Sequence, residues 1–209
     1  MNNRPLVSVV TPTWNRHETL LNVCIPSVQK QTYPNIEHII VCDGMDLSLM
    51  KDLLGISLQG PHHDLRSVAL GRNWHHFTGG TSVGAIPRRV GTYLSQGSYI
   101  AYLDDDDEYL PDHIESLVEL IERENVDFVF SQMKRDWSDD RGDDVIGDGN
   151  ILYGRVGTPM LLHKAECLQK VNWQTEGYGE DFTFYVDLVN AGYRWAFLPQ
   201  ITSLYHKKV

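Results

Sequence analysis

The sequence predicts a single α/β domain over residues 1–209, with helices on both faces of a mixed, mostly parallel central sheet. Three observations support this prediction. Short β-rich apolar runs alternate with segments whose apolar residues recur at helical spacing. The 209 residues are 42% apolar, which is enough for one well-filled core. No change of composition and no internal repeat marks a second domain.

The chain is expected to start with a strand, a helix and a second strand. The apolar run at 6–10 predicts the first strand, and apolar spacing over 15–31 predicts the helix. Asn15 is expected to cap this helix, with Glu18 three residues later as the reciprocal acid. The second strand is expected at 36–42, where it ends before an Asp-Gly turn.

Two strands and two helices are expected in the middle of the chain. Residues 66–70 predict the third strand and residues 98–103 the fourth. The helix between them is expected at 85–96 and is closed by Gly97. The helix after the fourth strand is expected to begin at Pro111, because proline is favoured at the first helical position.

The last third of the chain continues the mixture of strands and helices. A strand is expected at 126–133, and the acidic, glycine-rich stretch at 136–150 indicates a loop or a hairpin. The remaining expected elements are a short strand at 160–163, a helix at 180–190, and strands near 193–198 and 201–205.

Charge, cysteine content and hydropathy restrict the partners and the location. The formal charge of −10 disfavours nucleic acid and anionic lipid as partners. The three cysteines, an odd number without metal-type spacing, fit a reducing compartment. No segment approaches the roughly 18 apolar residues of a membrane span, and the amino terminus lacks a signal-peptide pattern. We therefore expect a cytoplasmic protein without a membrane span; the oligomeric state stays open, with a homodimer as one possibility.

Polar residues follow three of the expected strands where ligands bind in open α/β sheets, beyond the carboxyl ends of the strands. Pro12, Thr13 and Trp14 follow the first strand, and Asp43 follows the second. Five acids, residues 104–108, follow the fourth strand. These groups are expected to converge on one rim of the sheet.

The acidic run DDDDE has two interpretations. It could be a solvated turn whose charge favours the start of the next helix. Alternatively, because the run directly follows an apolar strand, its first members are held close together, and their repulsion favours a bound cation. Carboxylate oxygens suit Mg²⁺ or Mn²⁺, which keep positions free for phosphate oxygens.

Four blocks in order, VSVVTPTWNR, IIVCDG, YIAYLDDDDEYLPDH and GYGEDFTFY, resemble the nucleotide-sugar glycosyltransferases of family 2. The resemblance covers most of the chain. It implies the GT-A fold, a Rossmann-like arrangement, and mostly inverting sugar transfer. It also implies a nucleotide-sugar-binding half at about 1–107 and an acceptor-binding half at about 108–209.

The resemblance implies a nucleotide pocket after the first two strands. Pro12, Thr13, Trp14 and Asn15 would line it, with the Trp14 ring stacked on the base where the family has tyrosine. Asp43 would contact the base edge, as in relatives that use uridine donors; its alternative is a turn aspartate before glycine.

In the acidic run, the resemblance matches Asp104 and Asp106 to the two aspartates of the DxD motif. Asp104 and Asp105 would contact the nucleotide, with Asp105 beside the ribose or the metal. Asp106 would be the ligand of Mn²⁺ or Mg²⁺. Asp107 and Glu108 are expected to face water.

Two basic residues are also implied. Arg88 would reach the base or the diphosphate; the alternative is a surface arginine. His206 would lie against the metal or the diphosphate, as a histidine after the last strand does in some relatives; the alternative is a frayed tail.

The fourth block implies the catalytic base. Asp181, preceded by Glu180, would face the acceptor and remove its hydroxyl proton; the alternative is a pair of acids that interact with the helix dipole. Glu180, Trp173 and Tyr178 would contact the acceptor, the two rings by stacking on a sugar. Residues 134–158 are expected to shape the same site.

Three functions remain open. The first is an inverting, metal-dependent transferase that moves a sugar from a nucleoside diphosphate sugar, most readily a UDP-sugar, to an acceptor hydroxyl. The second is a nucleotidyltransferase, which needs a glycine-rich, lysine-bearing loop that TPTWNRHE does not supply. The third is a module that binds a nucleotide sugar without turnover. The stretch 46–87 departs from the family pattern, and the acceptor class stays open.

Overall fold

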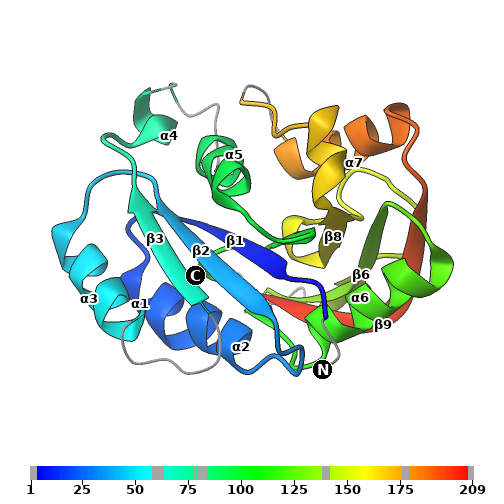
Figure 1. Ribbon diagram of the computed structural model, residues 1–209, viewed down its shortest axis with the longest axis horizontal. Helices are drawn as coiled ribbons and strands as arrows, with labels where there is room; N and C mark the ends of the chain where they lie inside the picture. The colour runs from blue at the N-terminus through cyan, green and yellow to red at the C-terminus, as the bar shows by residue number, and fades with distance from the viewer. Residues whose placement is uncertain are drawn as a thin grey trace.

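The computed structural model describes residues 4–57, 64–77, 79, 84–137, 142–175 and 179–206. Its helices lie on both faces of one central sheet (Figure 1). The strands are β1 (Val7–Thr13), β2 (Ile36–Cys42), β3 (Asp64–Ala69), β4 (Tyr99–Tyr102), β5 (Glu108–Tyr109), β6 (Phe128–Asp136), β7 (Asp144–Ile146), β8 (Leu161–Lys164) and β9 (Trp195–His206). The α-helices are α1 (His17–Thr19), α2 (Ile25–Gln29), α3 (Leu47–Ser57), α4 (Trp74–Phe77), α5 (Ala85–Leu94), α6 (His113–Glu124) and α7 (Glu180–Asn190).

The strand order is β3-β2-β1-β4-β8-β6-β9-β5, and β7 pairs with β6. The block β3-β2-β1-β4 is parallel throughout, so its carboxyl ends share one edge. β8 runs antiparallel to both β4 and β6, whereas β9 runs parallel to β6. The predicted mixed, mostly parallel central sheet is confirmed.

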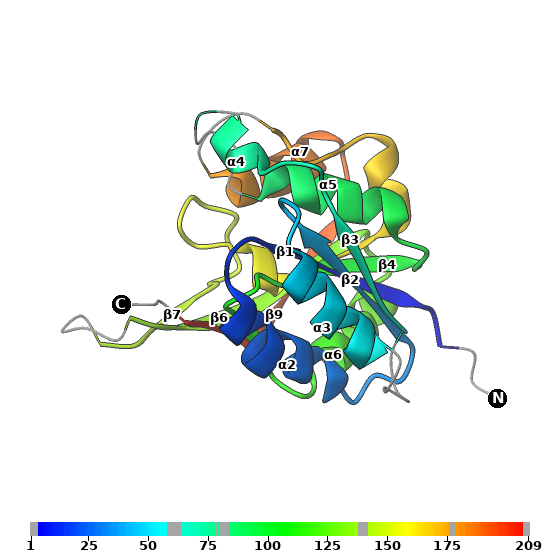
Figure 2. The same ribbon diagram turned by 90° about the vertical axis from the view of Figure 1, so that its left-hand side faces the viewer.

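Alternating side chains of the strands build a core on each face of the sheet. Val7 and Val9 of β1 pack in the core under α2, α3 and α6, whereas Val10 packs in the core under α5 and α7. The two helical layers are seen edge-on in Figure 2. The helices α2, α3 and α6 lie below the sheet in that view, and α4, α5 and α7 lie above it.

The first helix begins two residues later than predicted. Asn15 has φ 55° and does not cap it; Arg16 takes the preceding position and His17 starts the helix. The predicted Asn15 cap is therefore wrong. Asparagine tolerates the left-handed region, and here it turns the chain from β1 into a helix that continues through a π-helical segment, Leu20–Cys24, into α2.

Three further elements differ from their predictions. The helix α3 lies in the stretch that gave no clear pattern, and its first turn is held by the Asp46 carboxylate, which accepts a hydrogen bond from the Leu49 N–H at 3.0 Å. The helix α6 begins at His113 rather than at Pro111. The two expected last strands form one strand, β9, because the chain stays extended across the register shift opposite Ser131.

Within the acidic, glycine-rich stretch, β7 pairs antiparallel with β6, so the hairpin is the correct alternative. The three cysteines, Cys24, Cys42 and Cys167, are free and buried. No helix in the described part of the chain is long and apolar enough to cross a membrane.

Two buried histidines predict how stability depends on pH. His163 is fully buried, its Nδ1 donates to the Lys164 carbonyl at 2.8 Å, and its Nε2 lies 2.9 Å from the Tyr102 hydroxyl. Burial lowers the pKa of His163 to about 4 and that of His113 to about 3. In the unfolded chain both titrate at their ordinary pKa, so each contributes stability above pH ~6.5 that is lost as the pH falls toward the folded pKa.

As the pH is lowered from 6.5 to 5, we expect the unfolding free energy to fall by about 2 kcal/mol for each of the two histidines. In His163→Gln the decline of unfolding free energy over this range should be shallower by that amount. Urea unfolding at both pH values measures it, and an unchanged decline would show that His163 is protonated in the folded state.

Candidate active site

The carboxyl ends of β1, β2 and β4 bring three of the predicted groups to one rim of the sheet. Thr13 is the last residue of β1, Asp43 directly follows β2, and the acidic run follows β4. The Thr13 hydroxyl donates to Asp105 Oδ2 at 2.8 Å, which ties the loop after β1 to the acidic run. The expected convergence is confirmed for these residues.

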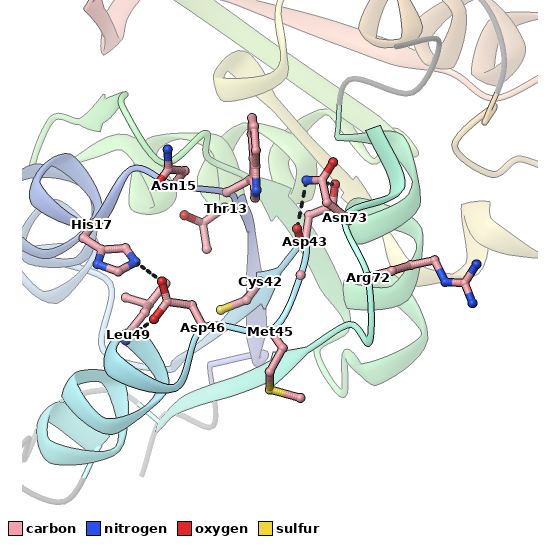
Figure 3. Close-up of a pocket in the computed structure, with 12 residues that line it drawn as sticks. Thr13, Asn15, His17, Cys42, Asp43, Met45, Asp46, Leu49, Arg72 and Asn73 are labelled. Atoms are coloured by element: carbon pink, nitrogen blue, oxygen red, sulfur yellow. Dashed lines mark hydrogen bonds and ion pairs between the residues drawn. The ribbon is translucent and has the colours of Figure 1, made fainter. Parts of the chain in front are cut away.

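A cavity of about 280 Å³ opens beside the ends of β1 and β2 (Figure 3). Trp14 is 46% exposed, and its ring meets the His76 ring edge-on at 4.8 Å, so one aromatic surface is available to a ligand. His17 Nε2 lies 2.9 Å from Asp46 Oδ2 on the opposite wall. The lining consists of Thr13, Trp14, Asn15, His17, Cys42, Asp43, Gly44, Met45, Asp46, Leu49, Arg72 and Asn73. Pro12 is buried within β1 and is not among them.

The Asp43 carboxylate is buried and hydrogen-bonded to the start of α4 and the residue before it. Its Oδ1 accepts from the Trp74 N–H at 2.9 Å, and its Oδ2 accepts from Asn73 Nδ2 at 3.2 Å. Figure 3 shows Asp43 facing Asn73, whereas the Arg72 guanidinium points away from the cavity. Asp43 is thus more than a turn aspartate, because it fixes the position of Asn73 on the cavity wall.

Arg16 is the residue at this rim that the sequence interpretation missed. Its Nη1 lies 3.0 Å from Asp105 Oδ1 and 2.8 Å from Asp106 Oδ2. Burial raises the pKa of Asp106 to about 6, although the Arg16 charge opposes this shift. Burial also raises the pKa of Asp105, against the hydrogen bond from Thr13. The Arg16 guanidinium therefore neutralises part of the negative charge of the acidic run.

The fourth acid of the run is buried rather than exposed to water. Asp107 is fully buried; its Oδ1 accepts from the His206 N–H at 3.3 Å, and its Oδ2 has no hydrogen-bond partner among the described residues. The prediction that Asp107 faces water is wrong, because β9 packs over the run. Glu108 is half-buried and pairs through β5 with Leu204 of β9. Burial, followed by the charge of Asp104, holds the pKa of Asp107 well above its usual range.

A second, larger cavity of about 570 Å³ lies between the acidic run and the start of α7. The buried Arg88 of α5 joins its two sides, with its guanidinium 2.5 Å from Asp104 Oδ1 and 2.5 Å from Glu180 Oε1. The same guanidinium lies 5.1 Å from the centre of the Trp173 ring. The lining consists of Arg88, Asp104, Asp107, Met133, Arg135, Trp137, Ile146, Tyr153, Gly154, Val156, Gly157, Thr158, Pro159, Gly179, Glu180, Asp181 and Tyr205.

Arg88 is not the surface residue of the alternative interpretation, since only 5% of it is exposed. Burial lowers its pKa, but the adjacent charges of Asp104 and Glu180 outweigh burial and raise it. The structure places Arg88 at the larger cavity and not among the residues that line the smaller one. Its predicted contact with the base thus has no support from this geometry, whereas contact with a diphosphate stays a prediction.

Asp181 lies on the wall of the larger cavity in the first turn of α7. Gly179, at φ 78°, gives the chain the left-handed turn that starts this helix. Asp181 Oδ1 accepts from the Phe182 N–H at 2.7 Å, and burial raises the pKa of the carboxyl. An acid with this raised pKa is suited to exchange a proton with a group bound in the cavity.

The three predicted acceptor contacts have different outcomes. Glu180 lines the larger cavity, but its carboxylate is held by Arg88. Trp173 is only 1% exposed and stacks on Phe184 at 4.4 Å, so the prediction that its ring stacks on a sugar is wrong. Tyr178 lies outside the described residues. Between residues 134 and 158, the cavity is lined by Arg135, Trp137, Ile146, Tyr153, Gly154, Val156, Gly157 and Thr158.

No cluster of three or more His, Cys, Asp or Glu side chains within the described ranges could by itself enclose a metal ion. The Nε2 atom of His206 lies 3.3 Å from Glu108 Oε2, not beside the proposed metal ligand Asp106. His206 is the last residue of β9, so the alternative of a frayed tail does not apply to it. A carboxylate pair with open positions is nevertheless the donor set that Mg²⁺ and Mn²⁺ accept when phosphate oxygens and water complete the shell. In this structure Asp106 Oδ2 lies 2.8 Å from Arg16 Nη1, and Asp107 Oδ2 is buried without a hydrogen-bond partner among the described residues, so metal binding by Asp106 stays a prediction.

The family model described as "Glycosyl transferase family 2" matches residues 8–52 and 84–176. The putative teichuronic acid biosynthesis glycosyltransferase TuaG of Bacillus subtilis is 30% identical over 80% of this chain and 56% of its own length. The putative colanic acid biosynthesis glycosyl transferase WcaA of Escherichia coli is 34% identical over 54% of this chain and 37% of its own length. The chain thus spans about half the length, or less, of these two relatives.

A third relative, from Escherichia coli, is named UDP-Glc:alpha-D-GlcNAc-diphosphoundecaprenol beta-1,3-glucosyltransferase WfaP and is 29% identical over 60% of this chain and 45% of its own length. Among solved structures, S. aureus TarS 1-349 in complex with UDP superposes with a TM-score of 0.77 over 97% of this chain and 61% of that one, at 17% identity. The complex of the same protein with UDP-GlcNAc gives a TM-score of 0.78 over 98% of this chain and 59% of that one, at 17% identity. The predicted GT-A fold is confirmed by these matches.

Proposed function

Because the chain belongs to glycosyl transferase family 2, we propose that it moves a sugar from a nucleoside diphosphate sugar to an acceptor hydroxyl. The observation that carries the proposal is the larger cavity. One wall of it presents Asp104, at the end of β4, and another presents Asp181, at the start of α7. A group that holds the donor and a group that deprotonates the acceptor would thus act in the same cavity.

The donor is proposed to be a UDP-sugar. The smaller cavity offers the exposed Trp14 ring for stacking and the Asp43–Asn73 pair for hydrogen bonds with a base. WfaP carries UDP-Glc in its name, and TarS was crystallised with UDP and with UDP-GlcNAc. These names describe the relatives, and they favour uridine as the first base to test.

The metal is proposed to be Mg²⁺ or Mn²⁺, with Asp106 as the first ligand. Arg16 already pairs with Asp106, so a bound cation would either share the Asp106 carboxylate with the Arg16 guanidinium or displace this guanidinium. When bound, the ion would neutralise charge on the departing diphosphate. His206 is proposed near the same diphosphate, at the far side of the acidic run.

Asp181 is proposed as the general base. The O–H bond of the acceptor breaks toward the Asp181 carboxylate while the acceptor oxygen forms its bond to the anomeric carbon and the bond to the diphosphate oxygen breaks. The two oxygens then lie on opposite sides of the sugar, and a single displacement inverts its configuration.

Thermal unfolding with UDP, TDP, GDP or CDP, each with and without Mn²⁺, tests the donor and the metal together. A nucleotide at about a hundred times its Kd should add roughly 2.7 kcal/mol to the unfolding free energy. We expect UDP with Mn²⁺ to give the largest shift. Asp106→Asn should abolish the part that depends on the metal, whereas Asp52→Asn, at an exposed position on α3, should retain it. If no nucleotide shifts the midpoint, the proposed donor class is wrong.

A further inference from the structure

The larger cavity has a second set of side chains, away from Asp104 and Asp181, that the proposed chemistry does not use. Three of these side chains are aromatic, and they come from three separate parts of the chain. Tyr153 stands in the loop after β7, whereas Trp137 follows the end of β6 and Tyr205 lies near the end of β9. The proposed function leaves open which residues bind the acceptor. These rings are candidates, because they line the cavity that the acceptor would enter.

The Tyr153 ring is fixed in place and yet open to solvent. It meets the Phe182 ring of α7 at 5.8 Å and 90°. A Cβ added to Gly179 would lie 2.8 Å from Tyr153 Cε2, so the backbone before α7 packs directly against the ring. Despite these contacts, 62% of Tyr153 is exposed. An aromatic ring that is held at its edge and left exposed is a stacking surface.

The Trp137 ring is oriented by a polar network. Trp137 Nε1 donates to Asp144 Oδ1 at 3.0 Å, and the Arg135 guanidinium lies 4.9 Å from the centre of the Trp137 ring. Arg135 in turn pairs with Asp144 through two of its nitrogens. The centres of the Tyr205 and Trp137 rings lie 5.9 Å apart. These contacts leave Trp137 little freedom to turn, so its ring is a fixed part of the wall.

The charge of the cavity restricts the chemistry of its occupant. The lining carries four acids (Asp104, Asp107, Glu180, Asp181) and two arginines (Arg88, Arg135), a formal charge of −2. Both arginines are paired with acids of this chain. A negative group of the acceptor placed beside the Asp181 carboxylate would be repelled, and a purely apolar acceptor would desolvate the acids without hydrogen bonds in return.

We infer that the acceptor is an uncharged pyranose, stacked on Tyr153 and flanked by Trp137, with a hydroxyl directed to Asp181. A pyranose combines a flat C–H face, which suits the rings, with hydroxyls, which suit the acids. The inference rests on the proposed function, because it places the acceptor of that reaction in the same cavity. It assigns to Tyr153 the role that the buried Trp173 cannot fill.

Saturation-transfer difference NMR with the whole chain, UDP and Mg²⁺ tests this inference. The probes are p-nitrophenyl β-D-glucopyranoside, its N-acetylglucosaminide and its galactoside, with sorbitol and glycerol 3-phosphate as the acyclic and the charged comparison. We expect saturation of the ring C–H protons of at least one pyranoside and none for sorbitol or glycerol 3-phosphate. Absence of a signal from all three pyranosides, or binding of glycerol 3-phosphate instead, overturns the inference.

Three variants distinguish the loss of ring stacking on Tyr153 from a general disturbance of the fold. Tyr153→Ala should weaken pyranoside binding about tenfold, the loss expected for one aromatic contact. Tyr153→Phe keeps the ring and should retain binding. Tyr93→Ala removes a similarly exposed tyrosine that does not line the cavity, and it should leave pyranoside binding unchanged. Unchanged binding in Tyr153→Ala overturns the inference.

The UDP-induced shift of the unfolding midpoint keeps the two proposals apart. If UDP stabilises the protein but Tyr153→Ala does not weaken pyranoside binding, the acceptor inference fails and the donor proposal stands. If none of UDP, TDP, GDP and CDP gives a shift, the proposed function fails, whatever the pyranosides do.

Discussion

Asp181→Asn is expected to lower the turnover number by at least about 100-fold while the fold and nucleotide binding are retained. The asparagine has nearly the same shape, and its Oδ1 can still accept the hydrogen bond from the Phe182 N–H. It cannot take a proton from an acceptor hydroxyl. The loss should therefore appear in kcat, not in the Kd for UDP.

The measurement is the initial rate of UDP release from UDP-glucose and UDP-N-acetylglucosamine with a pyranoside acceptor. Asp187→Asn is the matched control, because Asp187 lies on the same helix and, among the described contacts, its carboxylate accepts a hydrogen bond only from Gln174 Nε2, at 3.1 Å. Its rate should equal that of the unmodified chain. A fully active Asp181→Asn variant would assign the base to another residue.

Arg88→Met is expected to lower the unfolding free energy by about 3 kcal/mol or more. The substitution leaves two acids of the larger cavity, Asp104 and Glu180, without their shared counterion. Glu180 is 9% exposed, so its charge is poorly solvated once Arg88 is gone. Methionine keeps an unbranched apolar side chain but removes the guanidinium from above the Trp173 ring, so the loss reports the two ion pairs together with this cation–π contact.

Urea unfolding measures this loss, with Arg89→Met as the control on the next residue of α5. Arg89 is half-buried, and the control should stay within about 0.5 kcal/mol of the unmodified chain. The double variant Arg88→Met with Glu180→Met removes both charges of one pair and should recover part of the loss. A single variant as stable as the unmodified chain would mean that water reaches these acids.

Elements with strong local patterns were predictable from the sequence. The strand β2 and the helix α7 have the expected bounds, 36–42 and 180–190, because apolar spacing and flanking glycines define them locally. The helix α3 was missed, since only Leu49 and Leu53 of it are buried and its apolar stripe is weak. Asn15 was misassigned because its backbone is left-handed, which the sequence does not reveal.

The site was predictable where the resemblance supplied motifs and not where distant residues meet. Arg16 contacts Asp105 from 89 positions away, and no spacing rule connects them. Trp173 precedes the proposed base in sequence, which favoured a stacking role, but packing against Tyr102 and Phe184 buries it. Asp107 was expected in water because the strand that covers it, β9, comes almost a hundred residues later.

The contact between Asp107 and His206 also has a consequence for synthesis of the protein. The acidic run and the loop after β1 leave the ribosome early, but β9, which closes over Asp107 and pairs with β5, is made last of the described strands. Since chains grow at about 5–20 residues per second, the acids spend several seconds without this cover. A nascent chain therefore holds a solvated, highly charged loop, and the larger cavity acquires its buried Asp107 carboxylate only after β9 has been made.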